Sequence, residues 1–226
     1  MNKKAIVAMS GGVDSSVAAF LMQEQGYECI GATMKLFHNE DICLSGSHTC
    51  CSLDDVEDAK NVACRLGIPH YVFNFTERFK EDVIDAFVAA CENGRTPNPC
   101  IDCNRYLKFE KLLRRAQELE YDYIATGHYA KIEYDAAGGR YLLKRAADKT
   151  KDQSYVLYNM PKQLLGKVLF PLGNFESKED VRKIAKEHNL SVASKPDSED
   201  ICFIPDGNYK KFLEQNSSIV PKEGNI

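Results

Sequence analysis

Residues 4–16, KAIVAMSGGVDSS, decide the fold of this chain. The apolar run over residues 4–9 predicts a short buried parallel strand. A turn of serines and glycines follows, and apolar residues then recur at helical spacing as far as Gly26, which predicts a helix. Glycines between a buried strand and a helix N-terminus let backbone amides approach an anion closely. The sequence therefore predicts a phosphate-binding loop at the start of an α/β domain.

Side chains within this loop add to its chemistry. Ser10, Ser15 and Ser16 offer hydroxyl donors, whereas Asp14 suits either a helix cap or a ligand of Mg²⁺. The spacing matches neither Gly-x-x-x-x-Gly-Lys-Ser/Thr nor Gly-x-Gly-x-x-Gly, which excludes the two most familiar nucleotide loops. A plain capped helix after a tight turn is the alternative without a ligand.

The rest of the chain alternates between strand and helix patterns. Further strands are predicted over 28–35, 70–75 and 123–126, and helices over 52–66, 77–91, 104–118 and 176–189. Residues 37–51 and 94–103 read as loops, and 131–134 with 140–144 as a hairpin. The pattern fades after Gly207. This alternation predicts a parallel sheet with helices on both faces.

Composition limits the class of protein. The chain has 226 residues, a net charge of −4 and nine cysteines. It contains no apolar run of the roughly 18 residues that a membrane span needs, and its start does not resemble a secretory signal. We therefore expect a cytoplasmic protein without membrane association. The charge gives no overall basic field, so binding to nucleic acid needs a local patch. The many cysteines favour thiol chemistry or metal binding over a disulfide scaffold.

The loop at residues 10–15 resembles the Ser-Gly-Gly-x-Asp-Ser loop of the ATP pyrophosphatases. Members of this superfamily have the adenine nucleotide alpha hydrolase-like fold and split ATP between its α and β phosphates. The resemblance implies that the loop holds the leaving pyrophosphate while AMP is transferred to an oxygen. ATP and Mg²⁺ are the implied cofactors.

Four more stretches extend the resemblance. Together with 8–16, residues 96–108, 125–130, 152–157 and 194–204 resemble, in order, motifs of the bacterial tRNA-specific 2-thiouridylases. The resemblance covers residues 4–205 and implies ATP-dependent replacement of the 2-oxygen of the wobble uridine by sulfur. It also implies a catalytic domain over 1–205, followed over 206–226 by a linker and the start of a central domain. The family continues through that central domain and a β-barrel.

The resemblance assigns roles to particular residues. It implies that Cys202 carries a transferable persulfide and that Cys103 attacks it, which leaves a disulfide between them. The implied ATP contacts are Ala8, Met9, Ser10, Gly11, Gly12, Val13, Asp14, Ser15, Met34 and Gly127. The implied tRNA contacts are Asn98, Pro99 and Cys100 around the target base, together with His128, Lys151, Asp152 and Gln153. Asp152 is the residue expected to orient or polarise the base. A persulfide-delivering sulfur carrier and tRNA are the implied partners, and the oligomeric state stays open.

Cys100 departs from the family pattern, because many relatives carry an acid at this position. Cys100 and Cys103 form Cys-x-x-Cys, and Cys202 supplies a third thiol. Related thiolating enzymes hold a 4Fe–4S cluster with three such cysteines, so a cluster is the alternative to the persulfide. For Cys103 a helix N-terminus lowers the thiol pKa, and for Cys202 we expect Lys195 to offset the neighbouring acids.

Other functions and features stay open at this level. An amide-forming ligase uses the same loop but leaves Cys103 and Cys202 without a role, and a non-catalytic nucleotide-binding fragment is a third interpretation. His38, Cys43, His48, Cys50 and Cys51 match no standard zinc spacing, so we expect thiols without metal there. The basic run Lys108, Lys111, Arg114 and Arg115 suits either a solvated helix face or contacts with tRNA phosphates.

Overall fold

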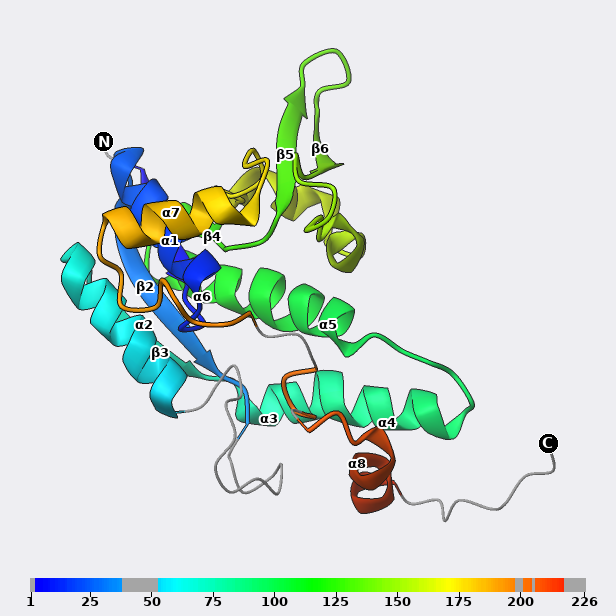
Figure 1. Cartoon of the computed structure of the whole chain (residues 1–226). Coiled ribbons are helices and arrows are strands. Elements are labelled where there is room, and N and C mark those ends of the chain that lie inside the picture. Colours follow the sequence, from blue (N-terminus) through cyan, green and yellow to red (C-terminus); the bar gives the residue numbers. More distant parts are fainter. Residues whose placement is uncertain (1–2, 38–52, 198–200, 205, 218–226) are drawn as a thin grey trace.

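The strand that precedes the phosphate loop lies at the centre of a parallel sheet. The structure, a computed structural model, describes residues 3–37, 53–197, 201–204 and 206–217. The sheet has the order β3-β2-β1-β4-β7 and every neighbouring pair is parallel. Its strands are β1 (Lys4–Ala8), β2 (Glu28–Lys35), β3 (His70–Asn74), β4 (Tyr123–Ala125) and β7 (Val168–Leu169). The expected parallel α/β sheet is confirmed (Figure 1).

Alternation along β1 divides the core into two layers. Ile6 and Ala8 belong to one buried cluster, whereas Ala5 and Val7 belong to the other. Successive side chains of a strand point to opposite faces of the sheet, so a strand buried on both faces needs helices on both sides. One side carries α1 (Val13–Glu24), α2 (Leu53–Leu66) and α7 (Lys178–Glu187), and α1 and α7 lie side by side (Figure 1). Helices on both faces are thereby confirmed.

Two long helical runs cover the other face, and each contains a π-helical segment. The first comprises α3 (Thr76–Phe79), η1 (Lys80–Ile84) and α4 (Asp85–Glu92). The second comprises α5 (Pro99–Asp102), η2 (Cys103–Lys111) and α6 (Leu112–Glu118). The segments η1 and η2 contact each other, and both are π-helical. The helices expected over 77–91 and 104–118 are therefore present.

The second run begins earlier than the sequence predicts. Residues 94–103 read as a loop, yet the helix starts at Pro99. The Asn98 Oδ1 atom accepts a hydrogen bond from the Cys100 amide at 3.0 Å, and proline occupies the first helical position. Both features favour helix initiation, since the cap satisfies an open amide and proline has no amide to satisfy. The expectation of a loop was wrong because the two prolines masked this capping signal.

The remaining elements lie at the edges of the domain. The expected hairpin is present as β5 (Ala130–Asp135) and β6 (Arg140–Arg145), and it projects from the sheet (Figure 1). Two 3-10 helices follow, η3 (Ser154–Leu157) and η4 (Lys162–Lys167), ahead of β7. Within the described ranges, no helix is long and apolar enough to cross a lipid bilayer.

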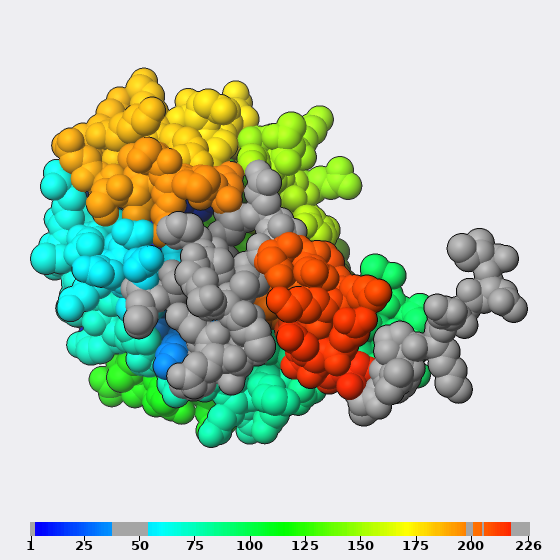
Figure 2. Space-filling view, turned by 60° about the horizontal axis from the view of Figure 1, so that its bottom comes forward, coloured from blue at the N-terminus to red at the C-terminus, as the bar shows by residue number. Residues whose placement is uncertain are grey.

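A helix that the sequence did not predict, α8 (Tyr209–Asn216), follows the fading pattern at Gly207. Its Phe212 ring lies 6.3 Å from Phe87 and 5.2 Å from Phe203, measured between centroids. α8 shares one face of the molecule with α2 and with the segment before residue 197 (Figure 2). The boundary expected at 205/206 stays a prediction, although Phe212 packs into the core of the preceding residues.

The close approach of β4 to α1 gives a test of this arrangement. A Cβ atom on Gly127 would lie 2.7 Å from both the carbonyl carbon of Asp14 and the amide nitrogen of Ser15. Since backbone cannot move aside cheaply, we expect Gly127→Ala to lower the free energy of unfolding by about 1–3 kcal/mol in urea titrations. Gly138→Ala is the control, because its Cβ would meet the flexible carboxylate of Asp135 at 2.5 Å. Equal losses for the two variants would contradict this account.

Candidate active site

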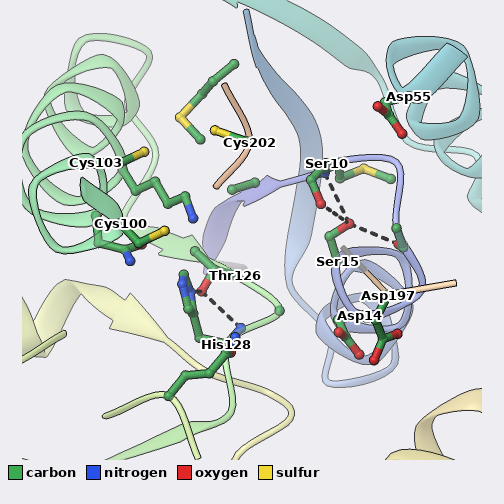
Figure 3. Close-up of a pocket in the computed structure, with 18 of the residues that line it drawn as sticks. Ser10, Asp14, Ser15, Asp55, Cys100, Cys103, Thr126, His128, Asp197 and Cys202 are labelled. Atoms are coloured by element: carbon green, nitrogen blue, oxygen red, sulfur yellow. Dashed lines mark hydrogen bonds between the residues drawn. The ribbon is translucent and has the colours of Figure 1, made fainter. Parts of the chain in front are cut away.

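A cavity of about 580 Å³ opens at the carboxyl ends of β1, β2 and β4. The chain turns to β2 on one side of β1 and to β4 on the other, so the cavity lies where the strand order reverses. Ligands of open α/β sheets bind at such positions. The phosphate loop forms one wall, the N-terminal part of the second helical run forms another, and residues 195–197 and 201–203 contribute a third (Figure 3).

Internal hydrogen bonds fix the shape of the phosphate loop. The Ser15 hydroxyl accepts from the Ser10 amide at 3.1 Å and donates to the Gly12 carbonyl at 3.1 Å. The Ser16 hydroxyl donates to the same carbonyl at 2.8 Å. Gly11 has a φ of 73°, and a Cβ there would collide with the backbone of Asp55. The turn therefore needs glycine at this position.

The N-terminus of α1 faces the cavity. Gly12 is its N-cap residue, and no side chain caps the first turn. Uncapped amides and the helix dipole place partial positive charge at this end, which favours an anion such as a phosphate group. The amides of Val13, Asp14 and Ser15 are therefore available for a ligand, as the loop pattern predicts.

Asp14 has a different partner set from the two that the sequence suggests. Its carboxylate accepts from the Tyr129 hydroxyl at 2.8 Å and from the Lys178 ammonium at 2.6 Å. Burial, followed by the charge of Asp14, raises the pKa of Tyr129. Lys178 is buried and also pairs with Asp197 at 3.1 Å. Asp14 therefore anchors the loop to α7 rather than capping α1.

Lys195 forms a second tie to the loop. Its ammonium donates to the Gly11 carbonyl at 3.0 Å and to the carboxylates of Asp55 at 2.6 Å and Asp58 at 2.5 Å. Although burial opposes the charged form, these two carboxylates raise the pKa of Lys195. The ammonium is therefore committed to the loop and to α2. The expectation that Lys195 offsets the acids around Cys202 stays a prediction, because residues 198–200 lie outside the described part of the chain.

The first turns of the second helical run carry one set of cavity residues. Cys100 is exposed, Cys103 and Asn104 are buried, and Lys108 is half-buried. All four line the cavity, as does Pro99. Positions three or four apart share a helix face, and in a π-helix residues five apart lie one turn apart. The winding of η2 thus brings Cys103, Asn104 and Lys108 to one wall.

The basic run on this helix divides into two parts. Lys108 lines the cavity, whereas Arg114 and Arg115 lie on the exposed side and pair with Glu118 at 3.4 and 2.8 Å. Arg114 and Arg115 therefore belong to a solvent-exposed helix face. Lys108 instead presents positive charge to the cavity.

Cys202 comes from a separate segment. Phe203 and Ile204 after it are both buried, and Phe203 packs edge-on against Phe79 and Phe87 at 5.7 Å. The anchored neighbours hold the half-buried Cys202 at the cavity. Figure 3 shows Cys100 and Cys103 on the helical wall across the cavity from Ser10 and Ser15, with Cys202 on its own segment.

The arrangement of the three cysteines bears on the iron–sulfur alternative. Among the described residues, no three His, Cys, Asp or Glu side chains are grouped closely enough to hold a metal ion. Cys100, Cys103 and Cys202 therefore do not form a preassembled cluster site in this conformation. The group at His38, Cys43, His48, Cys50 and Cys51 lies outside the described residues.

Nearly all of the expected ATP contacts lie on the cavity wall. The lining includes Ala8, Met9, Ser10, Gly12, Val13, Asp14, Ser15, Met34 and Gly127. Gly11 is the exception, and it packs against the backbone of Asp55. Their roles in binding stay a prediction.

The expected tRNA contacts separate into two groups. Pro99, Cys100, His128, Lys151 and Gln153 line the cavity. Asn98 and Asp152 do not, and both accept hydrogen bonds from backbone amides. Asp152 accepts from the Ala146 amide at 2.8 Å and from the Ser154 hydroxyl at 2.8 Å. Asp152 is therefore engaged in shaping its own turn.

His128 is a buried residue. Thr126 Oγ1 lies 2.7 Å from its Nδ1 atom, and the rings of Phe109 and Phe170 lie 6.0 and 5.9 Å away. Burial, followed by the charge of Lys108, holds the pKa of His128 well below its usual range. The imidazole thus offers hydrogen bonding to a ligand, not charge.

Several cavity residues had no signal in the sequence. Lys178 lies in a helix far from every motif, and its pairing with Asp14 spans 164 positions. Tyr129 and Asp197 stand inside stretches already singled out, but with no role attached. Asn104 follows Cys103 directly, and its burial could not be read from the local pattern.

Comparisons with known proteins identify the family of the chain. The family described as "tRNA methyl transferase HUP domain" matches residues 3–206. The tRNA-specific 2-thiouridylase MnmA of Caldicellulosiruptor saccharolyticus is 56% identical, with 100% of this chain and 64% of the relative covered. That of Clostridioides difficile is 51% identical, with 99% and 62% covered. The chain thus spans less than two thirds of the length of these relatives.

Solved structures support the fold. A 4-thiouridine synthetase–RNA complex with bound ATP matches with a TM-score of 0.56 and 20% identity, over 94% of this chain and 50% of that one. The NMN synthetase of Francisella tularensis matches with a TM-score of 0.53 and 18% identity, over 98% and 79%. At such identities these similarities concern the architecture alone.

The state of His128 predicts a pH effect on stability. Above the unfolded pKa of about 6.5 both states are neutral, and below it only the unfolded state gains the proton. The free energy of unfolding should therefore fall as the pH drops from 7 to 5, and His128→Asn should reduce this slope by as much as about 1.4 kcal/mol per pH unit. Urea titrations at several pH values measure it. An unchanged slope in the variant would show that His128 is protonated in the folded protein.

Proposed function

This chain belongs to the tRNA methyl transferase HUP domain family, and on that premise we propose that it thiolates the 2-position of the wobble uridine in tRNA at the expense of ATP. The relatives at 51–56% identity are named 2-thiouridylases, so the proposal follows them rather than the methyl transfer in the family description. The observation that carries the proposal is a common cavity for the phosphate loop, Cys103 and Cys202.

ATP is the proposed energy source. Its phosphates would lie at the N-terminus of α1, where the loop amides favour negative charge. Mg²⁺ would accompany the phosphates and supply further charge neutralisation. Magnesium in such sites takes one or two carboxylates beside phosphate oxygens and water. The cavity offers Asp14, Asp55 and Asp197, each paired with a lysine, so we expect the ion to be held mainly by ATP.

The first proposed step activates the base. Flipped out of the anticodon loop, the uracil brings its 2-oxygen to the α-phosphorus of ATP. A bond forms between this oxygen and phosphorus, the bond to the β-phosphate oxygen breaks, and pyrophosphate leaves with the electron pair. The N3 proton is released to water. The poor leaving group of an amide becomes a phosphate ester, which leaves readily.

The second proposed step delivers sulfur. The terminal sulfur of a Cys202 persulfide attacks C2, and AMP departs with the former 2-oxygen. The Cys103 thiolate then attacks the inner sulfur, the persulfide bond breaks towards the transferred sulfur, and a disulfide between Cys103 and Cys202 remains. The base regains its N3 proton from water. A persulfide-donating carrier protein and a thiol reductant restore the enzyme for the next cycle.

Recognition of tRNA is proposed for the rim of the same cavity. Lys151 and Gln153 line it, and Gln153 exchanges two hydrogen bonds with the backbone of Tyr129 at 3.0 and 2.8 Å. Asn98 and Asp152 would act by shaping the turns that present Pro99, Cys100 and Lys151. Because tRNA and ATP are the proposed substrates, we also propose a cytoplasmic location.

An amide-forming ligase is the competing function, and serine variants separate the two. We expect Cys103→Ser and Cys202→Ser each to lower 2-thiouridine formation by about a thousandfold or more, because each removes a sulfur that reacts. A ligase would keep its activity. The assay combines the chain, ATP, Mg²⁺, a persulfide donor and unmodified tRNA, followed by mass spectrometry of digested tRNA and counting of AMP. Cys64→Ser is the matched control, since this exposed thiol lies on α2 away from the cavity.

A chain extended to the full length of the relatives belongs in the same assay. Product from the extended chain alone would keep the chemistry and assign tRNA capture to the additional part. No thiouridine from either chain would overturn the proposal.

A further inference from the structure

Asn104 is a buried polar residue whose side-chain oxygen lacks a hydrogen bond. The residue is 3% exposed, and its Oδ1 atom has no donor within the described part of the chain. Buried carbonyl oxygens are nearly always paired, and leaving one unpaired costs stability. Asn104 also lines the cavity. The missing donor is therefore to be sought in a ligand of this cavity.

The position of Asn104 defines what such a ligand must be. It follows Cys103 in the chain, and Cys100 and Lys108 lie one helical turn to either side on the same wall. The phosphate loop forms the opposite wall (Figure 3). A group held by Asn104 therefore lies between the anion site and the thiols, where the proposed reaction needs its acceptor base.

The carboxylates and the other carboxamide on the described wall are already engaged, Asp55 through its pair with Lys195. Asp14 and Asp197 pair with Lys178, and Gln153 Oε1 accepts from the Tyr129 amide. The Lys108 ammonium carries only donors, so it cannot accept a hydrogen bond from a ligand. Among the carboxylate and carboxamide groups on the described wall, Asn104 is thus the one whose side-chain oxygen accepts no hydrogen bond, and it can accept one from a substrate N–H.

We propose that the Asn104 carboxamide binds the N3 edge of the reacting uracil. This inference rests on the proposed function and extends it to a residue that reads the substrate. Before activation N3 carries a proton, which Oδ1 accepts. Once the 2-oxygen is bonded to phosphorus, N3 has lost its proton and exposes a lone pair, to which the Nδ2 group donates after the amide rotates. A carboxamide has both a donor and an acceptor, so one side chain follows the base through both states.

A substitution separates this role from a structural one. Asn104→Leu replaces an unpaired polar group by an apolar one of similar size, so we expect the free energy of unfolding to stay equal or rise. The kcat/KM for tRNA thiolation should fall tenfold to about a hundredfold, with the Kd for ATP unchanged within about twofold. Arg105→Lys is the control: Arg105 Nε is the other buried side-chain atom of this helix without a hydrogen bond in the described part of the chain, it lies outside the cavity, and lysine keeps the charge. Its thiolation rate should match the parent.

A second comparison identifies the group that Asn104 reads. Anticodon stem–loop RNA with uridine or N3-methyluridine at the wobble position is given to the parent and to Asn104→Ala, whose smaller side chain leaves room for the methyl group. Methylation removes the N3 proton, so it should abolish thiolation of the base in every case. Binding is therefore the readout. The parent should bind methylated RNA at least about tenfold more weakly, and Asn104→Ala should bind both RNAs equally.

The outcomes distinguish failure of the Asn104 inference from failure of the proposed tRNA thiolation. No thiolation by the parent or by its extended form would overturn the proposed function and the inference with it. Thiolation that survives Asn104→Leu, or a methyl penalty of equal size in Asn104→Ala, would overturn the inference alone. A weakened Kd for ATP in Asn104→Leu would assign the residue to the nucleotide and would also overturn it.

Discussion

Neutralisation of the carboxylates around the phosphate loop is the constraint on which the site depends. The loop offers only partial charges from amides and a helix dipole, and a single unpaired carboxylate nearby would cancel their attraction for a polyphosphate. Asp14, Asp55, Asp58 and Asp197 all lie within reach of the loop or its supports. Lys178 and Lys195 pair with two of them each, at distances of 2.5–3.1 Å. The anion site therefore keeps its net attraction.

The same two lysines connect the loop to the segment that bears Cys202. Lys195 bonds to the loop carbonyl of Gly11, and Asp197 is joined to Asp14 through Lys178. Arg182 and Lys151 hold Asp197 from the other side at 2.9 and 3.2 Å. Although burial opposes it, Lys178 and Lys151 lower the pKa of Asp197. The sequence between 195 and 197 is thus fixed to the loop, and the buried Phe203 fixes the chain just beyond Cys202. The ion pairs thus position the phosphate site, and aromatic packing positions the thiol.

Patterns in the sequence predicted the structural elements that depend only on residues close together in the chain. The strand, loop and helix at residues 4–26 and the hairpin are continuous signals, and the structure contains both. The two-residue strand β7 is too short to show a period. The pairing of Asp14 with Lys178 and the commitment of Lys195 to Asp55 join distant segments, so they follow only from the folded topology. Asn104 was missed for the same reason, since a polar residue after a cysteine reads as surface until the opposite walls are in place.

The places where local rules fail lie around the cavity. Both π-helical segments border it, through Val83 on one side and Cys103 with Lys108 on the other. π-Helical turns are rare, and they recur at functional sites because they redirect side chains. On the same walls lie the buried His128, with its lowered pKa, and an Asn104 oxygen without a partner among the described residues. Sequences specify stable folds by agreement between local preference and packing, and they depart from it where function requires. These departures are concentrated at one cavity. Their concentration favours this cavity as the site of the proposed chemistry over the projecting hairpin or the exposed face of α6.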